Sequence, residues 1–257
     1  MVLYTAGRPE SKQAAWPRSS SPDAPRTQHR KVSRLIKIAP STLCADFRRL
    51  EEEALALVDA GVDCLHFDCM DGHFVENLTY GPIVLKALRE LTDIPFDTHL
   101  MIANPDAQIE SYAEAGADHI LFQAETDARP VRLLNRIRAL GKKAGIVYNP
   151  ATPLGEFETI LPAADIVMLM SVEPGAAGQK FMPVALDKIR VLREFIDREG
   201  LPTLISIDGG VNDETAPAII EAGIDLIVTG SWFFNHPEGY GGAMADFRRM
   251  DAEHGRG

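Results

Sequence analysis

The chain has 257 residues, of which 46% are hydrophobic and 25% are charged, as is typical of one large soluble globular domain. Its formal net charge of −11 argues against general binding of nucleic acid, because most of the surface would repel a phosphate backbone. A small anionic ligand is still allowed, because a few backbone N–H groups and helix ends are enough to bind one phosphate.

No apolar run is long enough to cross a membrane, and the N-terminus lacks the apolar centre of a signal peptide. We therefore expect no membrane association and a cytoplasmic location. The three cysteines, Cys44, Cys64 and Cys69, are too few and too irregular for a disulfide framework. We expect them to be small core hydrophobes in a reducing compartment.

Residues 1–35 differ in composition from the rest of the chain. They are rich in Pro, Ser, Arg and Gln, and they carry seven basic residues against two acidic ones. This composition is typical of a disordered extension, and an organelle-targeting segment is the alternative. Residues 36–257 are expected to form the catalytic domain.

From Ile36 onward one unit repeats: a short apolar run, a polar or glycine-containing turn, and a longer amphipathic stretch. The apolar runs predict strands at 36–39, 64–70, 95–101, 119–125, 143–149, 166–172, 203–209 and 226–232. Helical patterns lie between them, for example at 47–61 and 187–200. Glycines stand where the helices are expected to end, at Gly61, Gly116, Gly141, Gly200 and Gly223.

Eight strands that alternate with helices predict a parallel sheet. Such a sheet can be open and doubly wound, or closed into a (β/α)8 TIM barrel. Nearly every predicted strand ends in a cluster of polar residues. We therefore expect the closed barrel, with one shared site at the mouth formed by the carboxyl ends of its strands.

The second predicted strand carries the clearest pattern of polar residues. Because side chains alternate along a strand, His66, Asp68 and Met70 share one face, and Phe67 and Cys69 share the other. Placing the histidine and the carboxylate inward, with Phe67 and Cys69 under the helices, avoids burying a charge in apolar packing.

The third and seventh strands repeat this pattern, with His99 and Met101 on the third and Asp208 at the end of the seventh. Two histidines and two carboxylates from three strand ends would suit a divalent metal, first Zn2+, with Mn2+, Fe2+ or Co2+ as alternatives. Each residue alone is more simply explained as a satisfied polar group, but together, with the His-x-Asp spacing, they favour a metal site. His119 begins the fourth strand, at the wrong end for this site.

Small residues follow the last three strands: Gly175 to Gly178 after the sixth, Gly209 and Gly210 after the seventh, and Gly230 and Ser231 after the eighth. Small residues let backbone N–H groups approach an anion closely, and these loops are a common phosphate site in barrels. Any one of these segments is more often an ordinary turn, but the three together indicate phosphate binding.

At these residues the chain resembles the ribulose-phosphate 3-epimerase family, from residue 36 to about residue 235. The resemblance is carried by IAPSTLCADF (38–47), HFDCMDGHFVENLTYGP (66–82), DTHLMIANP (97–105), GIVYNPATP (145–153), MSVEPGAAGQKFMP (170–183), IDGGVN (207–212) and GS (230–231). The order and spacing of these segments make the resemblance specific.

The resemblance implies an isomerase of the pentose phosphate pathway that interconverts D-ribulose 5-phosphate and D-xylulose 5-phosphate. It implies two-base proton transfer by Asp68 and Asp208 through a metal-stabilised enediolate, and a homo-oligomer. The metal ligands it implies are His66, Asp68, His99 and Asp208.

The resemblance also implies two further groups of residues. The substrate contacts would be Ser41, His99, Gly175, Ala176, Ala177, Gly178, Gly209, Gly210, Gly230 and Ser231. Met70, Met101 and Met170 would lie over the reacting part of the sugar, although ordinary core packing explains each methionine equally well.

Four residues depart from the family pattern. Ala176 and Ala177 replace an aromatic residue and a glycine, Gln123 stands where many relatives carry histidine, and Glu76 replaces a proline. These departures leave the sugar open, so allulose 6-phosphate or another ketose phosphate is the alternative substrate.

Two other classes of barrel protein compete with the epimerase hypothesis. A phosphate-binding lyase is disfavoured, because no lysine is evident among the strand-end motifs. A non-catalytic sugar-phosphate binder would not require both Asp68 and Asp208.

Overall fold

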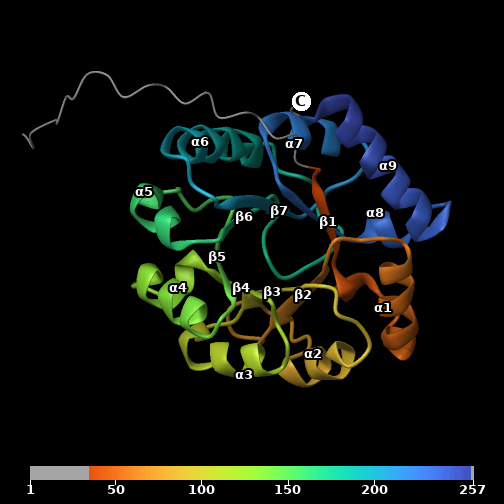
Figure 1. Ribbon diagram of the computed structural model, residues 1–257, viewed down its shortest axis with the longest axis horizontal. Coiled ribbons are helices and arrows are strands. Elements are labelled where there is room, and N and C mark those ends of the chain that lie inside the picture. Colours follow the sequence, from red (N-terminus) through yellow and green to blue (C-terminus); the bar gives the residue numbers. More distant parts are fainter. Residues whose placement is uncertain (1–34, 256–257) are drawn as a thin grey trace, which may run out of the picture. The chain divides into compact units, whose positions relative to one another are not determined.

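The computed structural model describes residues 35–255, in which eight strands alternate with helices (Figure 1). The strands are β1 Lys37–Pro40, β2 Leu65–Met70, β3 Phe96–Met101, β4 His119–Gln123, β5 Lys143–Tyr148, β6 Ile166–Met170, β7 Leu204–Asp208 and β8 Leu226–Thr229. The α-helices are α1 Leu50–Asp59, α2 Pro82–Arg89, α3 Ile109–Glu114, α4 Pro130–Ala139, α5 Phe157–Ile160, α6 Val184–Glu199, α7 Ala216–Ala222, α8 Ser231–Phe234 and α9 Gly239–His254.

All the strands are parallel, and they pair in the order β1-β8-β7-β6-β5-β4-β3-β2. A bridge between Ser41 and His66 joins the end of β1 to β2, so the sheet returns on itself. Figure 1 shows the ring of strands with the helices outside it. The predicted (β/α)8 TIM barrel is confirmed, and the open doubly wound sheet is excluded.

The predicted element boundaries are close to the observed ones, with two exceptions. The last predicted strand, 226–232, ends at Thr229, because Ser231 already begins α8. The helix predicted at 187–200 begins at Val184, directly after Pro183. The glycines predicted to end helices all have positive φ, for example 64° at Gly200 and 109° at Gly223, a conformation that favours glycine.

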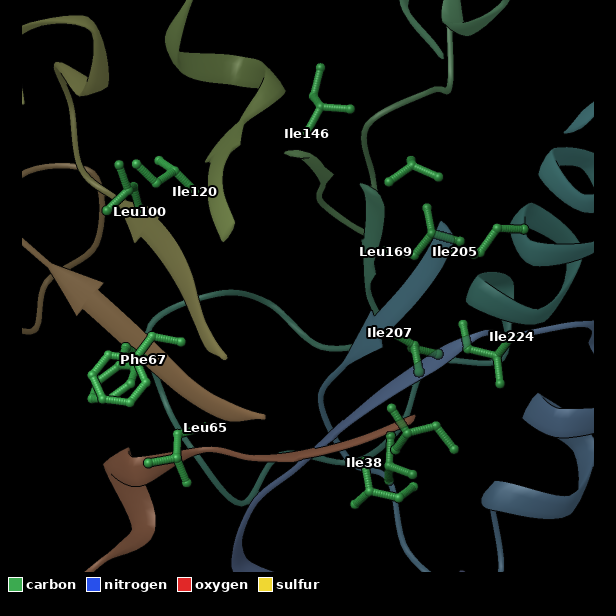
Figure 2. Packing of buried hydrophobic residues seen from close by; sticks show 14 of the residues in the cluster. Ile38, Leu65, Phe67, Leu100, Ile120, Ile146, Leu169, Ile205, Ile207 and Ile224 are labelled. Atoms are coloured by element: carbon green, nitrogen blue, oxygen red, sulfur yellow. The ribbon is translucent and has the colours of Figure 1, made fainter. Parts of the chain in front are cut away.

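The buried side chains form two layers. The outer layer lies between the strands and the helices, and Figure 2 shows part of it, including Phe67 and Leu100. The inner layer fills the barrel with side chains such as Leu121, Val147 and Met168. Phe67 and Cys69 belong to the outer layer, which confirms the predicted orientation of β2.

Four aspartates in equivalent positions stabilise one end of the barrel. This end lies opposite the mouth formed by the carboxyl ends of the strands. Just before every even-numbered strand, an aspartate carboxylate accepts a hydrogen bond from a backbone N–H of the preceding strand, and the N–H of the same aspartate donates to the carbonyl of that residue. The pairs are Asp63 with Ile38, Asp118 with Phe96, Asp165 with Ala144 and Asp225 with Ile205.

Each of these carboxylates also accepts a hydrogen bond from an arginine on the neighbouring helix. The arginines are Arg248 on α9, Arg89 on α2, Arg138 on α4 and Arg193 on α6, in the same order. We call these four units the aspartate–arginine clamps. Because they lie at the face away from the strand mouth, their role is to stabilise the fold.

Three further predictions have different outcomes. Cys64 and Cys69 are buried as predicted, but Cys44 is only half-buried and lines the pocket at the mouth, so its assignment to the core is wrong. Among the residues described, no helix is both long and apolar enough to span a membrane. The predicted extension at 1–35 lies outside the described residues, apart from Leu35, and stays a prediction.

Candidate active site

The carboxyl ends of the strands surround a pocket of about 500 Å³. Most of the predicted site residues line it: Ser41, Asp68, Met70, Met101, Met170, Gly175, Ala176, Ala177, Gly178, Asp208, Gly209, Gly210, Gly230 and Ser231. His66 and His99 are completely buried just behind its surface. The fold therefore brings together residues that lie up to 190 positions apart in the sequence, from Ser41 to Ser231.

Two carboxylates and two imidazole rings meet at the floor of this pocket. Oδ1 of Asp68 lies 3.4 Å from Nε2 of His66 and 3.3 Å from Nδ1 of His99. The same nitrogen of His99 lies 3.8 Å from Oδ2 of Asp208. One possible ligand atom from each of the four residues lies within 4.8 Å of the other three.

The two carboxylates have opposite electrostatic surroundings. Burial alone would raise the pKa of Asp68, but the neighbouring rings of His66 and His99 hold it well below its usual range. Burial and the nearby charge of Asp68 raise the pKa of Asp208 to about 6. Burial, with the charges of both aspartates, also raises the pKa of the Cys44 thiol to about 11.

Asp68 uses its two oxygens differently. Oδ1 faces the histidines, whereas Oδ2 accepts a hydrogen bond of 2.5 Å from the hydroxyl of Ser41. The serine hydroxyl in turn accepts a hydrogen bond from the backbone N–H of Leu43. This arrangement fixes the orientation of the carboxylate, with Oδ2 and the serine at the pocket wall.

Gln123, one of the departures from the family pattern, supports His99 from behind. Its side-chain Nε2 lies 2.9 Å from Nε2 of His99, and both side chains are fully buried. An amide can either donate or accept here, depending on its rotation about the last bond and on the tautomer of the ring. The substitution therefore keeps a hydrogen-bonding group against this nitrogen.

Asp97, which the sequence pattern did not indicate, contacts the other histidine. Its carboxylate is fully buried and accepts hydrogen bonds from Nδ1 of His66 at 2.8 Å and from Nδ1 of His119 at 3.0 Å. His119 does begin β4, as predicted, but it is linked to the site through Asp97. Alternation along the strand could have indicated its position, because Asp97 lies two residues from His99 and so shares its inward face.

The loops after β6 and β7 pack closely against each other beside the pocket. Gly209 and Gly210 have φ values of 113° and 62°, which favour glycine. A Cβ on Gly210 would lie 2.8 Å from the backbone nitrogen of Phe181. Gly210 is therefore required both by its conformation and by the approach of the neighbouring loop.

Two side chains hold the loop after β6 through contacts that the sequence did not reveal. Nε2 of Gln179 donates to the carbonyls of Glu173 and Ala176, at 2.6 and 2.9 Å. Nδ2 of Asn77, from the loop after β2, donates to the carbonyl of Gly175 at 2.6 Å. The small residues of this loop thus have a defined position at the rim. Nothing in the structure explains Glu76, which is exposed.

Comparison with known proteins shows which family the chain belongs to. A profile of the ribulose-phosphate 3 epimerase family matches residues 37–234. A ribulose-phosphate 3-epimerase of Synechocystis sp. is 48% identical over 219 residues, which are 84% of this chain and 95% of the relative. One from Mycobacterium tuberculosis is 52% identical over 194 residues, 76% of this chain and 84% of the relative.

Solved structures of more distant proteins share the fold. KGPDC from Streptococcus mutans superposes with a TM-score of 0.64 at 15% identity, covering 86% of this chain and 99% of that one. A tryptophan synthase alpha-subunit from Pyrococcus furiosus gives 0.60 at 16% identity, covering 85% and 96%. These likenesses concern the barrel alone. The family match and the high identity to its members show that the chain is an isomerase belonging to the ribulose-phosphate 3-epimerase family.

Proposed function

We propose that the chain interconverts D-ribulose 5-phosphate and D-xylulose 5-phosphate by moving a proton at C3, with Asp68 and Asp208 as the acid–base pair. The observation that carries this proposal is the approach of both carboxylates to one pocket and to one nitrogen of His99. Removing a proton from one face of a carbon and returning one to the other face requires two groups, and these come from separate strands, β2 and β7.

The donor set fits a divalent metal ion. His66, Asp68, His99 and Asp208 offer two nitrogens and two oxygens, a set suited to Zn2+, with Mn2+, Fe2+ or Co2+ as alternatives. Nε2 of His66 is buried and has no hydrogen-bond partner among the residues described, which suits a ligand atom. A cation held there would stabilise the negative charge that develops on the carbonyl oxygen when the C3 proton leaves.

The two oxygens of Asp68 suit two tasks. We propose that Oδ1, beside the histidines, would hold a metal ion, and that Oδ2, beside Ser41, exchanges the proton with the substrate. Asp208 would likewise hold the metal ion through one oxygen and exchange a proton through the other. Positioned groups of this kind typically accelerate a proton transfer by about 100- to 10,000-fold.

The phosphate would bind against the loops after β6, β7 and β8. Gly175, Gly178, Gly210, Gly230 and Ser231 line the pocket, and small residues leave backbone N–H groups accessible to an anion. Ser41 and His99 would position the sugar, and Met70, Met101 and Met170 would exclude water around C3. These methionines are buried and also line the pocket.

A second candidate substrate is allulose 6-phosphate, and the exposed Ala176 favours it. Ala176 does not fill the space of the aromatic residue that is usual at this position, so we propose that the rim can admit a longer sugar. A non-catalytic role in sugar-phosphate binding is the weaker alternative. Self-association stays a prediction of the family resemblance, and a cytoplasmic location stays a prediction from the sequence.

The proposal is tested by incubating the zinc-loaded protein in D2O with ribulose 5-phosphate and, separately, with allulose 6-phosphate. We expect conversion to the C3 epimer, with deuterium at C3 of the product and a higher kcat/KM for ribulose 5-phosphate. Higher kcat/KM for allulose 6-phosphate would reverse the choice of sugar. No deuterium at C3 of either sugar would refute the epimerase mechanism.

A further inference from the structure

Asp97 is a carboxylate in the interior of the barrel that does not line the pocket. It is buried. Burying a charged carboxylate is costly unless it is paired and hydrogen-bonded. Its partners are two imidazole rings, with Nδ1 of His66 2.8 Å from Oδ2 and Nδ1 of His119 3.0 Å from Oδ1.

The strand register places these three side chains in one row. His66 on β2 is the register partner of Asp97 on β3, and Asp97 is the partner of His119 on β4. Residues that are register partners in a parallel sheet lie on the same face. The row therefore runs across three neighbouring strands from the floor of the pocket toward the opposite end of the barrel.

The bond to Asp97 determines how His66 meets the active site. A carboxylate accepts, so Nδ1 of His66 must carry a hydrogen and donate it. The other ring nitrogen, Nε2, then points toward Oδ1 of Asp68, 3.4 Å away. Nε2 has no hydrogen-bond partner among the described residues, so Asp97 provides the hydrogen bond that sets the rotation of the ring.

We propose that Asp97 is a positioning residue of the active site, which holds Nδ1–H of His66 so that Nε2 faces Asp68, and that His119 anchors Asp97 from the other side. A carboxylate behind a histidine ligand orients the ring and increases its basicity. His119 occupies the second carboxylate oxygen and so prevents the carboxylate of Asp97 from rotating away. The inference rests on the proposed metal-binding function only for its effect on metal affinity.

The test uses the full chain labelled with 15N in its histidines and two independent readouts. The first is the Nδ1–H proton of His66, which we expect to be observed and protected from exchange with water in the wild type, with or without zinc. The second is the affinity for Zn2+, measured by competition with a chelator.

Asp97→Asn leaves one acceptor oxygen for two donors. We expect loss of the protected Nδ1–H signal of His66 and a fall in zinc affinity of about 10- to 100-fold. His119→Leu should cause a smaller change in the same direction. His119→Asn, which keeps an N–H donor near the position of Nδ1, should restore part of the loss. If Asp97→Asn fails to fold, the two His119 variants decide the question.

The matched control is Asp165→Asn, which changes a hydrogen-bonded carboxylate at the start of β6 and should lower stability without affecting either readout. An unprotected Nδ1 of His66 in the wild type would overturn the proposal. So would unchanged readouts in Asp97→Asn and His119→Leu. Failure of the wild type to bind zinc would refute the metal proposal, and the Nδ1–H signal would still decide the role of Asp97.

Discussion

Asp68 and Gly210 illustrate two different requirements that single residues meet at the mouth of the barrel. Asp68 supplies a functional group, and its neighbours Ser41, His66 and His99 determine where each oxygen points. Gly210 supplies only space and a backbone conformation, with φ of 62°. The first requirement depends on charge and the second on the absence of a side chain.

Gly210→Ala should impair phosphate binding. The new Cβ would lie 2.8 Å from the backbone nitrogen of Phe181, so the loops after β6 and β7 would have to separate. We expect a KM at least tenfold higher, together with a loss of stability of about 1–3 kcal/mol from the strained conformation. Steady-state kinetics and denaturant unfolding measure the two effects.

Gly141→Ala is the matched control, because Gly141 also has a positive φ, of 75°, but a Cβ there meets no atom within 4 Å. It should lower stability by about 1 kcal/mol and leave KM unchanged. Equal KM values for wild type and Gly210→Ala would show that the approach of the two loops does not shape the phosphate site.

The sequence was sufficient to predict the residues that carry functional groups at strand ends, because alternation along β2 and β3 fixes which side chains point inward. It was insufficient for Asp97, Gln179 and Asn77. The partners of Asp97 and Asn77 lie on other strands or loops, and Gln179 binds two carbonyls of its own loop. These contacts depend on strand register and loop conformation. The periodicity of one sequence segment gives no information about strand register or loop conformation.

At the scale of the element, each aspartate–arginine clamp joins two strands and a helix. Asp165 accepts from the backbone N–H of Ala144 on β5 at 2.9 Å and from Arg138 on α4 at 3.0 Å. Burial alone would raise the pKa of Asp165, but these hydrogen bonds and the positive charge of Arg138 lower it. The ionised form is therefore favoured in the folded state.

Asp165→Asn should destabilise the protein by about 1 kcal/mol at pH 7, since a hydrogen bond to a charged group is lost at a partly exposed and screened site. The folded pKa is lowered, so the wild-type advantage is fully present above the unfolded value of about 3.9 and disappears as the pH falls below it. Urea unfolding at pH 7 and near pH 3 measures the difference.

Asp187→Asn provides the control at this scale. Asp187 pairs with Arg190 on the surface of α6, with its side chain 81% exposed, and an exposed pair contributes little. The free energy of unfolding should stay within about 0.5 kcal/mol of the wild type. A pH-independent loss in Asp165→Asn would contradict the assigned role of its charge.

Element boundaries were predictable where a glycine or a change to polar residues marks them, as at Gly200 after α6. The boundaries were less predictable where several possible helix starts fit the same sequence pattern. The predicted start at residue 187 missed Val184, Ala185 and Leu186, because Pro183 fixes the start of α6 and the exposed Val184 breaks the expected polar face.

On the scale of the whole molecule, the barrel consists of four similar quarters, each with two strands and one clamp. The aspartates end the segments AGVD (60–63), AGAD (115–118), PAAD (162–165) and AGID (222–225). This repeat was present in the sequence, but its meaning depends on arginines that lie 27 to 185 positions away. Only the closed barrel brings them together.

Because the quarters share no clamp residue, their contributions to stability should add. The double variant Asp63→Asn with Asp165→Asn should lose the sum of the two single losses to within about 0.5 kcal/mol. Denaturant unfolding of the two single variants and the double variant gives the coupling. A coupling of more than about 1 kcal/mol would show that the quarters stabilise one another through the shared sheet.

The division of proton transfer between Asp68 and Asp208 is tested most directly by C3 hydrogen exchange in D2O with Asp68→Asn and Asp208→Asn, with the metal content measured in each. With metal retained, each variant should lose about 100- to 10,000-fold in epimerisation but still exchange the C3 hydrogen of one epimer, ribulose 5-phosphate for one variant and xylulose 5-phosphate for the other. A metal-loaded variant that epimerises at the wild-type rate, or exchanges both epimers equally, would contradict the two-base mechanism.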